Sequence, residues 1–233
     1  MGCAMITSPL DLHTVATLGP LRITTPVVTT WSVMAVLTGG SWLLTRRLAQ
    51  RPSKLQAALE LVVDVIAEQV RGTMGEEPAP YLPLIGTLFL FILFANWSSL
   101  IPGVEPPTAH LETDAALSLI VFAGTLWFGV KKLGVGGYLR TFAQPVFLIA
   151  PLNVVEVFTR TFSLVVRLFG NVMSGVFIIG VVLSLAGLLV PIPLMALDLL
   201  TGAVQAYIFA ALAMVFIGSA LNESAPPKAK ATA

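Results

Sequence analysis

The sequence predicts an all-α membrane protein with about five membrane-embedded helices and one interfacial amphipathic helix. Hydrophobic residues make up 56% of the 233 residues and charged residues only 11%, and the mean hydropathy is +0.90, values far outside the range of soluble proteins. Several stretches reach the roughly 20 apolar residues that a helix needs to cross a bilayer. Most cations lie between these stretches, as in membrane proteins whose basic loops stay in the cytoplasm.

The first predicted span and the amphipathic helix lie in the first third of the chain. The span covers about 25–45 and ends directly before a cluster of arginines. Residues 53–73 instead place Glu60, Asp64 and Glu68 on one helical face and aliphatic side chains on another. This pattern is typical of a helix that lies in the membrane surface.

Two further spans are predicted from apolar runs that are bounded by prolines and cations. One covers 82–101, with the amide of Asn96 near its far end. The other covers about 115–130 and is expected to stop at Lys131 and Lys132. The loop between the two spans contains acidic residues but no lysine or arginine, so it is expected on the outer side.

The last two helices are predicted to form a long, tilted hairpin. Residues 152–190 contain no proline and would measure roughly 58 Å as one helix, nearly twice a hydrocarbon core of about 30 Å. This helix therefore either tilts steeply or breaks near Gly170, Gly175 or Gly180. A glycine and two prolines then supply a turn, and the last helix covers about 194–221.

The distribution of cations predicts the orientation of the chain. Ten lysines and arginines fall on one side if the chain crosses the membrane five times: Arg46, Arg47, Arg51, Lys54, Arg71, Lys131, Lys132, Arg140, Lys228 and Lys230. The positive-inside rule makes this side the cytoplasm. A single membrane domain over 1–233 is expected, with an outer N-terminal segment at 1–24, membrane helices at 25–221 and a cytoplasmic tail at 222–233. The net charge of +1 leaves no basic face for nucleic acid.

Seven polar positions form a stripe along the helix predicted at 152–190. At about 100° per residue they fall within an arc of about 80°: Asn153, Glu156, Arg160, Ser163, Arg167, Asn171 and Ser174. A charge at membrane depth costs at least about 2.5 to 3.5 kcal/mol, so the stripe is expected to face protein or water rather than lipid.

The two arginines of the stripe need different explanations. Glu156 and Arg160 are four residues apart in the favourable order, so Arg160 either forms a structural ion pair or belongs to an ion path. Arg167 lies almost two turns further along and has no adjacent acid in the sequence. Because ionisable residues inside a membrane usually mark a substrate or ion path, Arg167 is predicted to be a functional charge.

The last helix contributes Asp198 and Gln205, which lie seven residues apart on one helical face. Gln205 follows Gly187 by 18 residues (205 − 187) and Arg167 precedes it by 20 (187 − 167). An antiparallel hairpin therefore brings Gln205 and Arg167 to a similar depth. A stripe of small residues permits close helix approach and is assigned to packing: Gly202, Ala206, Ala210 and Ala213.

These residues indicate an ion path that needs a partner. Glu156 is expected toward the cytoplasm and Asp198 toward the outside, with the guanidinium of Arg167 between them. Protons and small cations pass between carboxylates and water, whereas arginine keeps its proton and blocks a straight path. Because the chain has no spare carboxylate that could move past Arg167, a partner has to supply one.

Four segments carry the motifs of a known family. They read SLVVRLFGNVMS at 163–174, VPIPLMALDLLTGAVQAYIFAALAMVFI at 190–217, YLPLIGTLFLFILFANWSSLIPG from Tyr81 and LIAPLNVVEVFTRTFS from Leu148. Over about residues 50–223 the chain resembles subunit a of F-type ATP synthases. The segments 148–171 and 190–217 are most similar to the chloroplast and cyanobacterial forms.

The resemblance implies a non-catalytic, ion-translocating subunit in the inner membrane of a bacterial cell. Arg167 would be the essential arginine that faces the carboxylates of a rotating ring of c subunits, with Gln205 beside it. Asn171 would line the same interface, Glu156 would mark the cytoplasmic half-channel, and Asp198 would serve the outer one. The implied partners are the c-subunit ring, the b subunits of the peripheral stalk and the lipid bilayer. The transported ion would be H⁺ or Na⁺, and no cofactor or metal is implied.

One position departs from the family pattern. Most members carry Glu or His nine residues after the essential arginine, where this chain has Val176. In the chloroplast-like forms the position of Asp198 is glycine. The acid of the outer half-channel is therefore expected to have moved from one helix to the other.

Two other classes of function stay open on the residues alone. A proton-coupled transporter would need a substrate cavity near the midplane and usually an internal repeat, and the sequence shows no repeat. A structural membrane scaffold would leave the lone Arg167 as an unexplained energetic cost.

Overall fold

The computed structural model describes residues 14–18, 21–46, 54–101, 104, 106–142, 150–186 and 190–222. Within these ranges, two short strands are followed by α-helices, and two 3-10 turns lie between the third and fourth α-helix. The elements are β1 (Thr14–Leu18), β2 (Leu21–Thr24), α1 (Thr25–Thr45), α2 (Lys54–Met74), α3 (Leu82–Trp97), η1 (Ser98–Leu100), η2 (Pro107–Ala109), α4 (Leu111–Phe142), α5 (Ala150–Ala186) and α6 (Pro191–Asn222).

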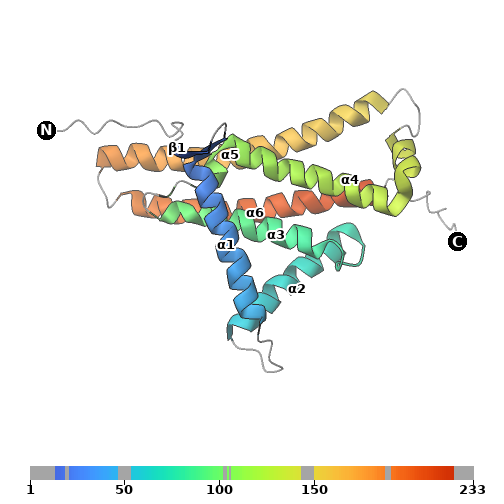
Figure 1. The fold of residues 1–233 in the computed structure, drawn as a ribbon, viewed down its shortest axis with the longest axis horizontal. Coiled ribbons are helices and arrows are strands. Elements are labelled where there is room, and N and C mark those ends of the chain that lie inside the picture. The colour runs from blue at the N-terminus through green and yellow to red at the C-terminus, as the bar shows by residue number, and fades with distance from the viewer. Residues whose placement is uncertain are drawn as a thin grey trace.

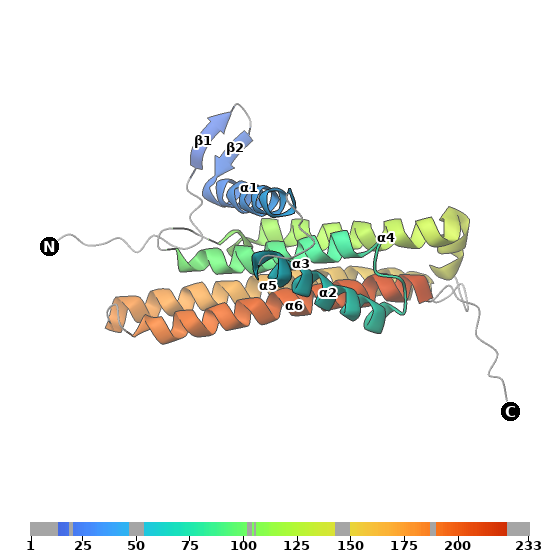
Figure 2. The same cartoon turned by 90° about the horizontal axis from the view of Figure 1, so that it is seen from below.

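The last four α-helices form the body of the protein. Figures 1 and 2 show α3, α4, α5 and α6 running along one direction, while α1 crosses them. α5 and α6 pack together as a hairpin, and α2 packs against α3 and α6. The β1–β2 hairpin stands apart from the long helices (Figure 2), so the elements that position the polar stripe of α5 are helical.

Four helices in the described part of the chain are long and apolar enough to cross a membrane. Their apolar stretches are Leu82–Leu100, Leu111–Lys132, Val155–Leu185 and Pro191–Leu221. α1 has 21 residues but is less apolar, because threonine, serine and glycine interrupt its aliphatic side chains. The all-α membrane fold is therefore confirmed, whereas the crossing by α1 that would make five spans stays a prediction.

The strands lie within the predicted outer N-terminal segment, residues 1–24. β1 and β2 pair antiparallel, with Leu18 opposite Leu21 and Thr17 opposite Arg22. Their sequences, TVATL and LRIT, are rich in the β-branched residues that favour strands. The all-α fold thus carries one small β-hairpin before its first helix.

The interfacial helix predicted at 53–73 corresponds to α2. Its acidic residues Glu60, Asp64 and Glu68 are exposed. Near its C-terminus Val70 and Met74 are buried, at 0% and 3% exposure, among side chains of α3 and α6. The amphipathic pattern is therefore confirmed.

The span predicted at about 115–130 ends at its two lysines as expected, since the apolar stretch of α4 is Leu111–Lys132. It begins slightly before the predicted start. α4 reaches Phe142 only across a kink at Gly134, whose non-helical φ of 73° and ψ of 162° suit a residue without a Cβ. Gly134 therefore separates the membrane helix from a second helical segment. Lys132 forms an ion pair with Glu76.

α5 resolves the choice between a tilted and a broken helix in favour of a continuous one. Its 37 residues have no non-helical residue at Gly170, Gly175 or Gly180. A continuous helix of this length, about 55 Å at 1.5 Å per residue, fits a thinner hydrocarbon core only when it is inclined. α6 begins at Pro191, slightly before the predicted start, because proline at the first helical position loses no hydrogen bond.

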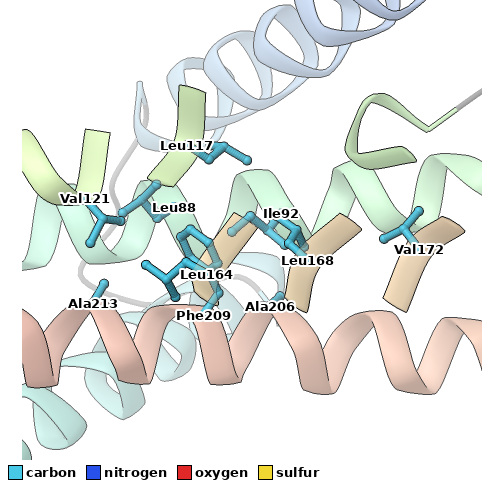
Figure 3. Packing of buried hydrophobic residues seen from close by; sticks show 10 residues of the cluster. All are labelled: Leu88, Ile92, Leu117, Val121, Leu164, Leu168, Val172, Ala206, Phe209 and Ala213. Carbon is cyan, nitrogen blue, oxygen red and sulfur yellow. The ribbon is translucent and has the colours of Figure 1, made fainter. Parts of the chain in front are cut away.

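A hydrophobic cluster joins α3, α4, α5 and α6 (Figure 3). It consists of Leu88 and Ile92 of α3, Leu117 and Val121 of α4, Leu164, Leu168 and Val172 of α5, and Ala206, Phe209 and Ala213 of α6. Three small residues of α6 predicted for close packing, Ala206, Ala210 and Ala213, are at most 4% exposed. The small side chains let the neighbouring helices approach α6 closely.

Polar contacts fix the end of α3 on α6. The Nδ2 of Asn96 donates a hydrogen bond to the carbonyl of Gly202 at 3.0 Å, and the Oγ1 of Thr108 donates to the Oδ1 of Asn96 at 2.7 Å. A Cβ added at Gly202 would lie 3.0 Å from the Cβ of Asn96. Glycine at this position therefore permits both the close approach of α3 and the buried hydrogen bond.

This contact predicts a selective loss of stability. Gly202→Val is expected to lower the stability of the purified protein by about 1 to 3 kcal/mol, because overpacking separates α3 from α6. Gly86→Val is the matched control, since nothing lies within 4 Å of a Cβ at Gly86. Thermal unfolding in one detergent measures both variants. Equal losses would contradict the packing role of Gly202.

Candidate functional site

The polar stripe of α5 runs along the edge of its buried face. Leu164 and Leu168 anchor α5 in the cluster at 2% and 0% exposure. Arg167 precedes Leu168 directly and is exposed, and Asn171 is partly buried. Because adjacent residues of a helix point about 100° apart, anchoring the leucines turns Arg167 outward at the margin of the contact with α6.

A groove of about 490 Å³ follows this margin. Its lining comprises Leu152, Val155, Glu156, Thr159, Arg160, Ser163, Leu164 and Arg167 of α5 with Leu212 and Phe216 of α6. The groove has room for several water molecules, each of which occupies about 30 Å³ in the liquid. The three charged residues of the stripe thus share one groove with apolar side chains on the surface of the α5–α6 hairpin.

Arg160 is tied to both helices of the hairpin. It forms an ion pair with Glu156 one turn earlier and donates a hydrogen bond to the Oγ of Ser219 at 3.2 Å. Its guanidinium carbon also lies 5.5 Å from the ring centroid of Phe216, within the range of a cation–π contact. The structural ion pair predicted as one of two alternatives is therefore present.

Arg167 has no such partner. Among the described residues it takes part in no ion pair, hydrogen bond or cation–π contact. Its guanidinium offers five N–H donors and does not lose its charge. A permanent charge in an apolar helix needs water or an anion from outside the chain.

The contact between Gly175 of α5 and Asp198 of α6 fixes the register of the hairpin. A Cβ added at Gly175 would collide with the carboxylate of Asp198, so these two residues lie opposite each other. Val176 therefore lies within one residue of the depth of Asp198. Its side chain packs against the hydrophobic cluster, on the side of α5 away from Arg167.

The same register places Gln205 near Arg167 in depth. Gln205 lies seven residues after Asp198 on α6. In the antiparallel hairpin this corresponds to seven residues before Gly175 on α5, so Gln205 lies opposite position 168. Gln205 is only 6% exposed, and its buried Nε2 has no hydrogen-bond partner among the described residues. Arg167 points outward at this level, whereas Gln205 lies inside the bundle.

A polar environment around Asp198 was not foreseen from the sequence. The Oγ of Ser99 donates a weak hydrogen bond to the Oδ2 of Asp198 at 3.5 Å, and the Nε1 of Trp97 donates to the carbonyl of Leu199 at 3.4 Å. The end of α3 therefore lies beside the first turns of α6. An amphipathic signal was lacking, because these polar residues follow an almost uniformly apolar helix.

Asp114 of α4 was also missed. It is 0% exposed and both its carboxylate oxygens lack a hydrogen-bond donor among the described residues. The predicted span began at 115, which left Asp114 in the outer loop. The usable signal was its spacing of four from Ser118, which is likewise buried.

Comparison with known proteins identifies the family. A family model described as ATP synthase A chain matches residues 27–218, which is most of the chain. The chain belongs to the ATP synthase A chain family. It is 53% identical over 221 residues to ATP synthase subunit a 2 of Bradyrhizobium sp. strain BTAi1, with 95% of this chain and 99% of that protein covered.

Other relatives agree with this assignment. ATP synthase subunit a 1 of Chlorobaculum parvum is 48% identical, with 87% of this chain and 90% of that protein covered. ATP synthase subunit a 2 of Acaryochloris marina is 47% identical, with 87% of each chain covered. The predicted resemblance to subunit a is confirmed, and the chain is a multi-pass membrane protein of the ATP synthase A chain family.

The contact between Gly175 and Asp198 predicts that a disulfide can form there. With Cys3 replaced by serine, Gly175→Cys combined with Asp198→Cys is expected to close a disulfide on mild oxidation. A Cβ at Gly175 would lie 2.9 Å from the Cγ of Asp198, which is compatible with the Cβ separation of about 3.5 to 4.5 Å in disulfides. Loss of thiol labelling in the denatured chain, reversed by reductant, measures the bond.

The control combines Gly180→Cys with Asp198→Cys. A Cβ at Gly180 would meet nothing within 4 Å, so both thiols should stay free. Similar oxidation of the two pairs would show that the register of α5 and α6 is different in the membrane.

Proposed function

We propose that this chain is the stationary ion-translocating subunit of the membrane sector of an ATP synthase. In this role Arg167 separates two offset half-channels for H⁺ or Na⁺ beside a rotating ring of c subunits. The observation that carries the proposal is the exposed guanidinium of Arg167, which has no partner among the described residues. Membership of the ATP synthase A chain family supports the same role.

The exposed face of α5 is where the proposed ring would pack. Only 11% of its apolar stretch is buried inside the chain, against 44% for α6. Ile178, Val181 and Leu185 lie within about 40° of Arg167 around the helix and are 51%, 41% and 82% exposed. Apolar contacts on this face would hold a ring helix near Arg167, and the b subunits and the lipid bilayer would cover other faces.

The charge of Arg167 determines where the ring carboxylates would release and bind their ions. An ionised carboxylate on the ring is attracted to the guanidinium, whereas a carboxylate neutralised by a proton or cation is not. Each ring carboxylate would therefore release its ion before passing Arg167 and bind another one afterwards. Release and uptake would occur from opposite sides, so rotation and ion flow would be coupled.

The two half-channels would use different parts of the hairpin. The groove that contains Glu156 would lead to the cytoplasmic side, where Glu156 and Arg160 form a charged entrance. Asp198, on the first turns of α6, would lie in the outer entrance. Gln205 and Asn171 lie at intermediate depth, and we assign them to the lining near Arg167.

The proposed location is the inner membrane of a bacterial cell. The N-terminus would lie outside and the C-terminus in the cytoplasm, which puts Arg71, Lys131 and Lys132 on the cytoplasmic side. We expect no ATP chemistry in this chain itself, because the proposed role is ion translocation. The single membrane domain would comprise the outer segment at 1–24, the helices at 25–221 and the tail at 222–233.

A proton-coupled transporter is the weaker alternative. Its substrate would need a cavity with a few convergent polar groups. A cavity of about 720 Å³ in the described part of the chain, between α1, α3 and α4, is lined by apolar side chains and by the hydroxyl groups of a few threonines and a serine, with no charged residue. The groove with the charged residues is open on the surface of the hairpin, as a partner-facing site requires.

Replacing Arg167 tests the proposed function. In the complete complex, reconstituted in liposomes, Arg167→Ala is expected to reduce ATP-driven ion pumping by about 100-fold or more, as when a key electrostatic group is removed from a reaction site. Passive ion leakage should increase, because neutral ring carboxylates could then pass between the half-channels. Arg167→Lys should also be poor, since an ammonium lacks the planar fork. A pH-sensitive dye or sodium uptake measures pumping.

Lys131→Ala is the control for loss of one cation, because Lys131 is exposed at the end of the apolar stretch of α4. Its pumping rate should stay close to that of the wild type. Substantial pumping by an assembled Arg167→Ala complex would refute the role of Arg167.

A second test concerns the acid that is absent at position 176. We propose that Asp198 takes over its role, since Val176 and Asp198 lie within one residue in depth. Asp198→Gly is expected to reduce proton-driven ATP synthesis strongly, and adding Val176→Glu should restore part of the rate. The measurement is a double-mutant cycle on synthesis rate, in which the two changes must be clearly non-additive. A double variant no faster than Asp198→Gly would end the relocation hypothesis.

A further inference from the structure

Three buried polar groups lack hydrogen-bond partners in the described part of the chain. They are the carboxylate of Asp114, the hydroxyl of Ser118 and the Nε2 of Gln205, on residues that are 0%, 0% and 6% exposed. Buried polar groups are normally paired, because an unpaired one loses its hydration without compensation. An ionised carboxylate without a donor is the most costly of the three. This cost indicates that the carboxylate holds a proton or a cation.

The Asp114 side of α4 faces the bundle. Thr113, Ala116 and Ile120 line the cavity toward α1 and α3. Asp114 lies about 100° or more around the helix from these three residues. Val121, within about 20° of Asp114, is buried in the cluster with α5 and α6. Asp114 and Ser118, one turn apart, therefore belong to the surface that packs against α5 and α6.

The helix registers give the depth of Asp114. A Cβ added at Gly124 of α4 would touch Leu84 of α3, so positions 124 and 84 lie opposite each other. Because the two helices run antiparallel, position 114 of α4, ten residues earlier, lies opposite position 94 of α3, ten residues later. Asn96 of α3 contacts Gly202 of α6, so position 94 corresponds to about 204. Asp114 therefore lies at about the depth of Gln205.

Gln205 in turn lies opposite position 168, directly after Arg167. The buried groups and the arginine are thus at similar depth but on different sides of α5. Arg167 lines the groove on the surface of the α5–α6 hairpin, whereas Asp114 lies inside the bundle. Asp198 is seven residues from Gln205, or about 10 Å nearer the outer end of α6.

We propose that Asp114, with Ser118 and Gln205, forms a second binding station for the transported monovalent cation, deeper than Asp198 and at the level of Arg167, on the other side of α5. The inference rests on the proposed function of the chain. The station offers carboxylate and hydroxyl oxygens, which suit either a proton or an alkali cation, and the Nε2 of Gln205, which can donate a hydrogen bond to the carboxylate or to a water molecule beside it. An ion entering past Asp198 would stop at Asp114 before it reaches the ring carboxylate beside Arg167.

The test uses the complete complex in liposomes. Asp114→Asn keeps the size of the side chain but cannot carry a proton or a negative charge. It is expected to lower ATP-driven pumping by about tenfold or more, a modest share of what a positioned proton-transfer group contributes. Glu112→Gln is the matched control, since Glu112 is exposed two residues away. Complex yield and ATP hydrolysis of the detached catalytic sector should stay unchanged in both variants.

The dependence of activity on the transported ion distinguishes ion binding by Asp114 from a purely structural role. If the wild type pumps protons without sodium, Asp114→Asn should shift the dependence of ATP synthesis on outer pH. If the wild type needs sodium, it should raise the sodium concentration for half-maximal activity several-fold. Asp114→Glu should retain a measurable part of the wild-type rate and its ion dependence.

The remaining outcomes are also decisive. Pumping by Asp114→Asn that equals that of Glu112→Gln at every outer pH and sodium concentration would overturn the inference. If Asp114→Asn fails to assemble, Ser118→Ala takes its place, and unchanged ion dependence in that variant overturns the inference. Arg167→Ala is measured in parallel: if it pumps, the proposed function has failed, whereas an inactive Arg167→Ala with a normal Asp114→Asn rejects only the station.

Discussion

Arg167 carries a permanent charge at membrane depth, and the packing of the long helices determines where that charge can lie. Leu164, Leu168 and Val172 hold α5 in the hydrophobic cluster, which fixes the rotation of the helix about its axis. Arg167 then has to point to the margin of the α5–α6 contact, where the groove begins. If α5 were rotated, either the leucines would lose their contacts or the guanidinium would be buried without a counter-ion. Both changes are costly, so the apolar core defines the position of the charge.

Close packing between α5 and α6 adds a second constraint. Gly175 lets the Asp198 carboxylate approach α5, and Gly202 accepts Asn96 of α3 on another side of α6. α6 therefore makes close contacts with two helices within about one turn. These contacts fix the depth of Asp198 relative to Arg167. The depth of each carboxylate matters for ion transfer, because a gap of several ångströms without water or a polar group interrupts it.

The fold and part of the candidate site could be predicted from the sequence because the bilayer imposes simple patterns. Long apolar runs predicted the helices of the body, and the polar stripe placed Arg167 and Glu156 on one face. Counting residues from Gly187 predicted the similar depth of Arg167 and Gln205. None of these inferences needed a contact between distant segments. The end of the third predicted span at Lys131 and Lys132 was also predicted correctly, whereas the second helical segment of α4 after Gly134 was not predicted, since cations indicate only the membrane boundary.

Features that depend on two helices could not be predicted in the same way. The sequence left the role of Arg160 open, because the residues that it contacts on the other helix, Ser219 and Phe216, belong to α6. Asp114 was assigned to a loop because its burial depends on α5 and α6, and because a helix start is uncertain by a few residues. Asp64 and Asp114 have the same side chain in the sequence. Only packing makes Asp64 an exposed charge and Asp114 a buried one.

The two sides of α5 divide the polar groups in a way that suits a discontinuous path. Glu156 and Arg167 open onto the surface groove, and Asp114 and Gln205 lie inside the bundle at the depth of Arg167. A continuous row of carboxylates on one side would let ions cross the membrane without any partner, and the ion gradient would be lost. In the proposed function, α5 lies between the two sets, and an ion would have to leave the interior at the depth of Arg167 and transfer to a group that moves. The position of a single helix, set by its apolar ridge, would thus prevent a leak and make passage depend on the partner.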